Sequence, residues 1–423
     1  MHKDLNNQGA PKAVANLALT TSTIAFTVCF AVWTIFSIIG VALKEQLGLS
    51  EMQFGLLVGT PVLAGSLVRV VLGAWTDRYG GRVVYSLTML AAAVSTTFLA
   101  FAQTYEQLLL AALGVGIAGG SFAVGVAYVS RFYPRERQGT ALGIFGVGNV
   151  GSSATKMLAP FVMLAWGWQS VALIWAGALA LVAVIFWFTT PDDPAEAKKQ
   201  ARERSWAEEF GPLRDMRVWR FALYYFFAFG AFVALTLWLP RYLIGVYGFD
   251  IATAGVVAAL YSIPASIFRA YGGVLSDKVG ARTVLYWTFG ISVAATFILA
   301  LPAGRYLVQG IDGPMSVSFA LAPWLFIVII FVLGFAMSLG KAAVFKHIPT
   351  YYPGNVGTVG GLVGMIGGLG GFVLPLLFGL LNELTGIWTS CFMAMFVLVV
   401  ALLVWMHVSV RQAERSASLP QAA

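Results

Sequence analysis

The chain consists largely of apolar segments that are each long enough to cross a lipid bilayer. A transmembrane helix needs roughly 20 predominantly apolar residues. Charged and turn-forming clusters divide the sequence into twelve such segments, at approximately 17–43, 52–76, 83–103, 107–130, 138–164, 168–189, 219–246, 252–275, 283–303, 320–346, 357–383 and 386–408. We therefore predict an all-α membrane protein with twelve transmembrane helices.

The composition agrees with this interpretation. Of the 423 residues, 59% are hydrophobic and only 10% are charged, whereas soluble domains carry about 25% charged residues. The net charge is +8, but the basic residues fall between apolar segments and form no stripe that could follow a nucleic acid. No nucleophile elbow, phosphate-binding loop or Cys/His metal spacing is present. We expect a lipid bilayer as the surroundings, no nucleic-acid partner, no enzyme activity, no metal and no cofactor.

One long charged connection divides the chain after the sixth segment. It predicts an N-terminal half at 1–190, a cytoplasmic linker at 191–217 and a C-terminal half at 218–423, with six helices in each half. Basic residues crowd the connections on the linker's side of the membrane, and the opposite side holds only Lys44, Arg241 and Arg305. Cytoplasmic loops carry the excess of lysine and arginine. We therefore expect both termini to be cytoplasmic and the protein to lie in the inner (plasma) membrane.

The two halves contain a recognisable repeat at a spacing of 200 residues. Residues 66–84 and 266–284 align without a gap, with identities at Ser66/Ser266, Arg69/Arg269, Gly73/Gly273, Asp77/Asp277, Gly80/Gly280, Arg82/Arg282 and Val84/Val284. Duplicated six-helix halves with a site at their interface are a transporter architecture. The repeat therefore predicts pseudo-symmetric halves around a central site.

Arg69 and Arg269 are the charges that most need an explanation. An arginine at the centre of a bilayer costs about 2.5–3.5 kcal/mol on insertion scales, and arginine does not lose its proton. A lone arginine can extend to the helix end, but the recurrence favours a shared role. No acidic residue falls in the middle of a predicted span. The two guanidiniums therefore predict a small anion as counter-ion, and their planar forks suit an oxyanion.

The stretches GAWTDRYGGR (73–82) and GVLSDKVGAR (273–282) resemble the loop signature of the major facilitator superfamily. This resemblance implies the major facilitator fold. It also implies that Asp77 and Asp277, with Arg82 and Arg282, form cytoplasmic latches that hold an outward-open state.

Two glycine-rich segments resemble the nitrate signatures of the nitrate/nitrite porter family. They are GVGNVGSSATKMLAP (146–160) and GLVGMIGGLGGFVLP (361–375). The resemblance implies that Arg69 and Arg269 bind nitrate or nitrite. It further implies assistance from Asn149, Tyr225 and Phe30.

Two lysines depart from the nitrate/nitrite-exchanger pattern of that family. Lys156 replaces a usual glutamine and Lys341 a usual asparagine, and GKAAVFKHIPTYYP resembles the branch associated with proton-coupled uptake. A lysine that shares a cavity with fixed arginines can release its proton and regain it when an anion arrives. We hypothesise this proton-coupling role for Lys341 first and Lys156 second. Extension of either lysine to the membrane surface remains the alternative.

These features together predict a monomeric secondary transporter that imports nitrate by alternating access, as nitrate/proton symport. Three alternatives stay open. The first is nitrate/nitrite antiport on the same scaffold. The second is transport of another small planar anion such as formate, and the third is a sensor that binds nitrate without moving it.

Overall fold

The computed structural model describes residues 11–49, 51–193, 205–311 and 313–418. All twelve predicted spans are helical there, which agrees with the predicted all-α fold. Ten helical segments of the described chain are long and apolar enough to cross a membrane. The other two predicted spans, 138–164 and 252–275, are also helical. The N-terminal half contains α1 (Lys12–Trp33), α2 (Phe36–Leu47), α3 (Glu51–Tyr79), α4 (Gly81–Leu99), α5 (Tyr105–Gly116), α6 (Ser121–Ser130), α7 (Gln138–Gly146), α8 (Gly151–Trp166) and α9 (Trp168–Thr189).

The C-terminal half repeats this arrangement after the linker. It contains α12 (Met216–Tyr225), α13 (Phe232–Tyr247), α14 (Ile251–Val279), α15 (Ala281–Ala300), α16 (Pro323–Tyr351), α17 (Val356–Thr385) and α18 (Ser390–Ser418). In the linker, α11 (Trp206–Phe210) begins with a capping box formed by Ser205 and Glu208. Part of the linker predicted at 191–217 lies outside the described residues.

Four of the spans are interrupted helices, which the apolar pattern does not reveal. The first span breaks at Thr34 and Ile35 between α1 and α2. A 3-10 turn (η2, Ile117–Gly120) joins α5 to α6, and another (η4, Val147–Val150) joins α7 to α8. A π-helical segment (η6, Phe226–Ala231) joins α12 to α13. Such departures from α geometry often mark functional sites, and three of these four adjoin the site described below.

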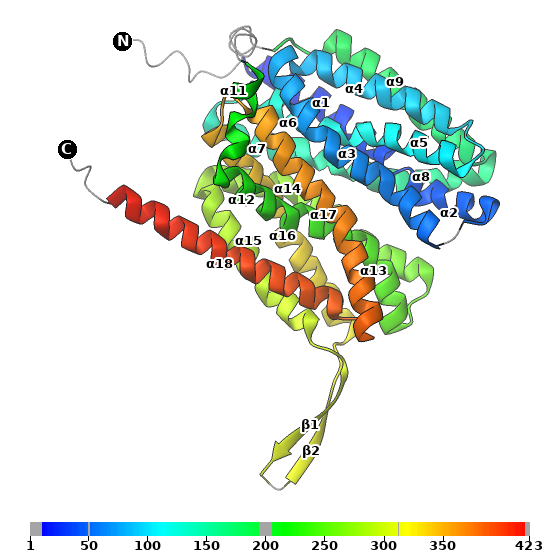
Figure 1. The fold of residues 1–423 in the computed structure, drawn as a ribbon, viewed down its shortest axis with the longest axis vertical. Coiled ribbons are helices and arrows are strands. Elements are labelled where there is room, and N and C mark those ends of the chain that lie inside the picture. The colour runs from blue at the N-terminus through cyan, green and yellow to red at the C-terminus, as the bar shows by residue number, and fades with distance from the viewer. Residues whose placement is uncertain (1–10, 50, 194–204, 312, 419–423) are drawn as a thin grey trace.

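The halves meet where the repeated glycines lie. Helix α3 runs along α17, and α14 runs along α7 (Figure 1). A Cβ atom on Gly73 would overlap the carbonyl oxygen of Gly357, and one on Gly273 would overlap that of Gly139. Glycine lets helix backbones approach this closely. The repeat found in the sequence therefore builds two equivalent backbone contacts between the halves.

A β-hairpin between α15 and α16 was not predicted from the sequence. Strands β1 (Gly304–Gly310) and β2 (Gly313–Phe319) pair antiparallel, and the hairpin projects from the helical body (Figure 1). The ladder closes at the pair Gly310 and Gly313, where Gly313 adopts a φ of 122°. Only glycine adopts this conformation readily.

Candidate anion-binding site

Arg69 lies on α3 and is completely buried. Its Nε donates a hydrogen bond to the carbonyl oxygen of Gly119 (3.0 Å), and Nη1 donates to that of Gly364 (2.5 Å). Its Nη2 has no partner. The rings of Trp33, Phe122 and Phe229 lie 5.6–5.7 Å from the guanidinium carbon. Carbonyl oxygens and aromatic faces therefore hold this charge, and no described carboxylate pairs with it.

Arg269 occupies the equivalent position on α14 and is 1% exposed. Its guanidinium carbon lies 4.9 Å from the ring of Phe122, the same ring that contacts Arg69. Its Nε and Nη1 donors are buried without a partner. The structure thus brings the two predicted arginines, one from each half, to a single aromatic side chain.

Tyr225 and Asn149 also bury polar atoms without a hydrogen-bond partner. Tyr225 ends α12, stacks on Phe229 with 5.1 Å between ring centroids and interacts electrostatically with both arginines. Its buried hydroxyl makes no hydrogen bond of good geometry. Asn149 lies in η4 with its amide nitrogen and oxygen both buried and unpartnered. A buried polar group without a partner is costly, so these groups together define a site for a hydrogen-bonding ligand.

Glycines on α7 and α17 provide the room for these side chains. A Cβ atom on Gly146 would overlap the guanidinium of Arg269, and one on Gly367 would overlap the ring of Tyr225. A Cβ on Gly364 would lie 3.2 Å from Cδ of Arg69. The spacing of the glycines predicted close packing of helices. Some of these glycines also leave space for the side chains of the site.

A cavity of about 380 Å³ lies beside this group, on the side of the molecule opposite Asp77 and Asp277. Asn149, Phe30 and Lys156 line it, together with Trp33 and Phe229. Phe30 packs on Trp33 with 4.8 Å between ring centroids. Its ring is not among those that contact the guanidinium groups of Arg69 and Arg269. Neither arginine is part of the cavity lining, and both are buried.

The two lysines occupy different surroundings. Lys341 on α16 is fully buried, with Nζ 3.5 Å from the ring centre of Phe232 and 3.4 Å from the carbonyl oxygen of Ala265. It also interacts electrostatically with Arg269. Lys341 therefore lies inside the C-terminal half and does not extend to the membrane surface. Lys156 faces the cavity on α8.

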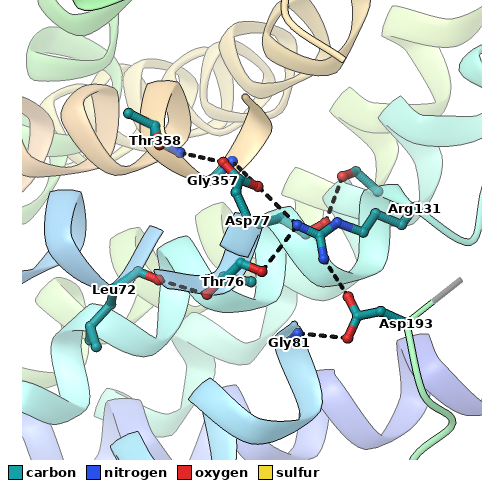
Figure 2. A network of polar contacts seen from close by, with 10 residues as sticks. Leu72, Thr76, Asp77, Gly81, Arg131, Asp193, Gly357 and Thr358 are labelled. Carbon is teal, nitrogen blue, oxygen red and sulfur yellow. Dashed lines mark hydrogen bonds and ion pairs between the residues drawn. The ribbon is translucent and has the colours of Figure 1, made fainter. Parts of the chain in front are cut away.

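The end of the N-terminal half that carries Asp77 holds a connected polar network (Figure 2). Asp77 accepts hydrogen bonds from the backbone amides of Gly357 (3.0 Å) and Thr358 (2.9 Å), across the interface between halves. Arg131 pairs with Asp77 at 2.9 Å and also with Asp193. Burial alone would lower the pKa of Arg131, but the carboxylates of Asp193 and Asp77 raise it above its usual value.

The C-terminal half carries the matching network with a different cation. Asp277 accepts hydrogen bonds from the amides of Gly139 (3.0 Å) and Thr140 (2.6 Å). Lys346 pairs with Asp277 at 2.7 Å. Each aspartate therefore binds the start of a helix from the opposite half, where backbone N–H groups are free and the helix dipole favours an anion.

Arg82 and Arg282 are not the partners of these aspartates. Arg82 pairs with Asp192 at 3.1 Å, and Arg282 pairs with Glu414 at 3.1 Å. Sequence reasoning missed Arg131 and Lys346, which carry the cationic side of the two networks. It also missed Phe122, which gives no signal in a sequence with 31 phenylalanines.

Two similar six-helix halves, with a cavity and a buried polar site between them, are an architecture of membrane transport proteins. The model of the Major Facilitator Superfamily matches residues 21–311. The chain belongs to that superfamily, which confirms the resemblance seen in its loop motifs.

Individual relatives cover nearly the whole chain. It is 42% identical to the probable nitrate/nitrite antiporter NarK1 of Thermus thermophilus, over 93% of this chain and 91% of the relative. It is 28% identical to the nitrite extrusion protein of Bacillus subtilis, over 93% and 94% of the two chains. The human organic anion transporter MFSD10 superposes with a TM-score of 0.77 at 16% identity, over 94% of this chain and all of that one. The last likeness concerns the fold alone.

Proposed function

We propose that this protein imports nitrate across the cytoplasmic membrane by alternating access, coupled to protons. The observation that carries the proposal is the group of buried, unpartnered polar atoms on Arg69, Arg269, Tyr225 and Asn149. Most of these atoms are N–H or O–H donors, and no described carboxylate pairs with either arginine. A small planar oxyanion accepts hydrogen bonds from several such donors at once. The printed names of the relatives favour nitrate or nitrite as that anion.

The division of the site between the halves supports alternating access. Arg69, Asn149 and Phe122 belong to the N-terminal half, and Arg269 and Tyr225 to the C-terminal half. An anion between the arginines reduces their mutual repulsion, so it favours the state in which the halves close around it. Release of the anion to the other side requires the two halves to separate at the end that carries Asp77 and Asp277, which breaks the contacts of these aspartates with the opposite half. We propose these contacts as the cytoplasmic latches, with the termini also on that side.

Lys341 is our proposed proton carrier. Its surroundings provide one carbonyl oxygen and one aromatic ring, and Arg269 lies near. A negative charge at the arginines therefore stabilises the protonated amine. Binding of the anion would then draw a proton to Lys341, and both would be released on the cytoplasmic side. Lys156, at the cavity, would attract the anion toward the site.

The test is nitrate uptake into proteoliposomes with and without an inward proton gradient. We expect the gradient to accelerate uptake by the parent protein, and Lys341→Ala to abolish that acceleration. The matched control Lys12→Ala removes a lysine from the exposed start of α1 and should behave as the parent. Equal accumulation with and without the gradient in the parent would overturn proton coupling.

Nitrate/nitrite antiport is the second candidate, because the 42% identical relative is named as such an exchanger. Vesicles loaded with nitrite distinguish the two. Antiport requires internal nitrite for nitrate entry at any pH, whereas symport does not. Competition by formate, which is also planar, tests whether the site prefers nitrate.

A further inference from the structure

A second cavity lies within the C-terminal half at the end that faces the linker. It measures about 430 Å³ and lies among α12, α15, α16 and α18. Three arginines line it: Arg217 and Arg220 from α12 and Arg282 from α15. His347 and Ser409 add further polar atoms. None of these side chains belongs to the anion site between the halves.

The positive charge in this cavity is only partly matched by the protein. Arg217 pairs with Asp215 at 3.4 Å, and Asp215 also accepts a hydrogen bond from Tyr352 at 2.5 Å. Arg282 pairs with Glu414 at 3.1 Å, where the two side chains are 48% and 63% exposed. Arg220 has neither a hydrogen bond nor an ion pair to any described residue. The cavity therefore presents cationic groups that an external anion can bind.

The equivalent region of the N-terminal half shows how the protein fills such a position itself. Arg82 corresponds to Arg282 in the repeat, and it pairs with Asp192 and lies over the ring of Trp187 at 5.2 Å. The neighbouring Asp193 binds Arg131 and the amide of Gly81. At the corresponding place in the C-terminal half, Arg282 pairs with Glu414 of α18, and both side chains are exposed. The repeated arginine of the C-terminal half therefore has a more exposed ion pair than Arg82, and Arg220 has no ion-pair partner among the described residues.

The walls and rim of the cavity suit an amphipathic ligand. Phe221 stacks on His347 with 5.1 Å between centroids, and Leu285 and Met406 add apolar surface. Tyr351 lines the cavity and is 45% exposed, and Trp219, elsewhere on α12, is 41% exposed. Tryptophan and tyrosine are enriched at membrane interfaces, so this position matches the headgroup level of the cytoplasmic leaflet.

We propose that this cavity binds the phosphate of an anionic phospholipid from the cytoplasmic leaflet. Arg220 would be the central phosphate ligand, with Arg217 and Arg282 on either side, while the apolar wall contacts the glycerol and the first acyl carbons. Basic pockets between helices on the cytoplasmic side recognise such headgroups. The lipid would join α12, the first helix after the linker, to α15 and α18. The inference uses the orientation of the chain but not the identity of the transported anion.

The experiment is native mass spectrometry of the full-length protein in detergent, titrated with phosphatidylglycerol or with phosphatidylcholine. We expect one phosphatidylglycerol to be retained preferentially. Arg217→Gln/Arg220→Gln should weaken that binding about tenfold or more, since each arginine near a lipid surface contributes about 1 kcal/mol. The control Arg411→Gln removes one positive charge from α18 outside the cavity and should bind as the parent.

Two results would overturn the proposal. One is equal retention of both lipids by the parent, and the other is equal weakening by Arg411→Gln and by the double variant. A further arm adds glycerol 1-phosphate at millimolar concentration. Failure to displace the lipid supports a lipid site, whereas displacement with equal affinity assigns the cavity to a soluble phosphate and overturns the lipid as its source.

Discussion

The two halves use the same backbone contacts but different side chains to complete them. Gly73 against Gly357 and Gly273 against Gly139 are equivalent contacts, and Asp77 and Asp277 bind equivalent helix starts. The cations differ, since Arg131 serves one aspartate and Lys346 the other. The repeat therefore preserves the close approach of helices, whereas the polar partners have diverged.

The same contrast separates the two buried arginines. Arg69 donates two hydrogen bonds to carbonyl oxygens, whereas Nε and Nη1 of Arg269 have no partner. Arg69 is thus held in place by the protein, and Arg269 keeps more of its donors for a ligand. We expect this asymmetry to appear when each arginine is replaced.

Replacing the arginines by lysine should give the largest effect. Arg269→Lys keeps the charge but loses the planar fork, and we expect kcat/KM for nitrate uptake to fall by roughly two orders of magnitude through the loss of charged hydrogen bonds. Arg69→Lys should reduce transport similarly and also lower the unfolding temperature, because two carbonyl oxygens lose their donor. Proteoliposome uptake and thermal unfolding in detergent measure the two effects. Equal unfolding temperatures for both variants would contradict the asymmetry.

Adding a methyl group at the glycine contacts between the halves should give the second-largest effect. Gly73→Ala or Gly273→Ala places a Cβ against a backbone carbonyl of the other half, so the halves must separate at that end. We expect either variant to increase labelling of a cysteine introduced at that interface by about tenfold, since overpacking costs roughly 1–3 kcal/mol. Gly290→Ala is the control, because no atom lies within 4 Å of its added Cβ. Unchanged labelling in both variants would show that the close contact does not hold this end shut.

Removing the charge that caps the first helix of the C-terminal half should give the smallest effect on stability. Helix α1 begins at Lys12 and its N-cap residue, Pro11, provides no side-chain cap, whereas Asp215 caps α12. Burial alone would raise the pKa of Asp215, but hydrogen bonds from Tyr352 and from the amide of Arg217 outweigh this and lower it below 3.8. The charge therefore stabilises the fold above the pKa of the unfolded chain, and this contribution is lost as the pH falls through the folded pKa.

Asp215→Asn tests that charge, since asparagine retains a capping oxygen. We expect a small decrease in unfolding temperature at pH 7 that disappears on acidification below the folded pKa of Asp215. Tyr352→Phe should raise that pKa. If the unfolding temperatures of Asp215→Asn and the parent still differed at low pH, the charge of Asp215 would not be the cause of the difference.

The sequence allowed most of the fold to be predicted, because a helix in lipid must be apolar over a fixed length. The hairpin at 304–319 escaped this rule, since it lies beyond the helix ends. The repeat located Arg69 and Arg269; the structure places Tyr225 beside both of them and Asn149 in the lining of the neighbouring cavity. Phe122, Arg131 and Lys346 could not be found in this way, because their roles depend on which helices, distant in the sequence, pack side by side.

The glycine contacts between the halves also bear on the entropy of closure. Where side chains form an interface, closing it restricts their rotamers, which costs up to about 2 kcal/mol for a long residue. Gly73, Gly139, Gly273 and Gly357 have no rotamers to lose. The close contacts at these four positions therefore add no side-chain entropy cost to closing this end.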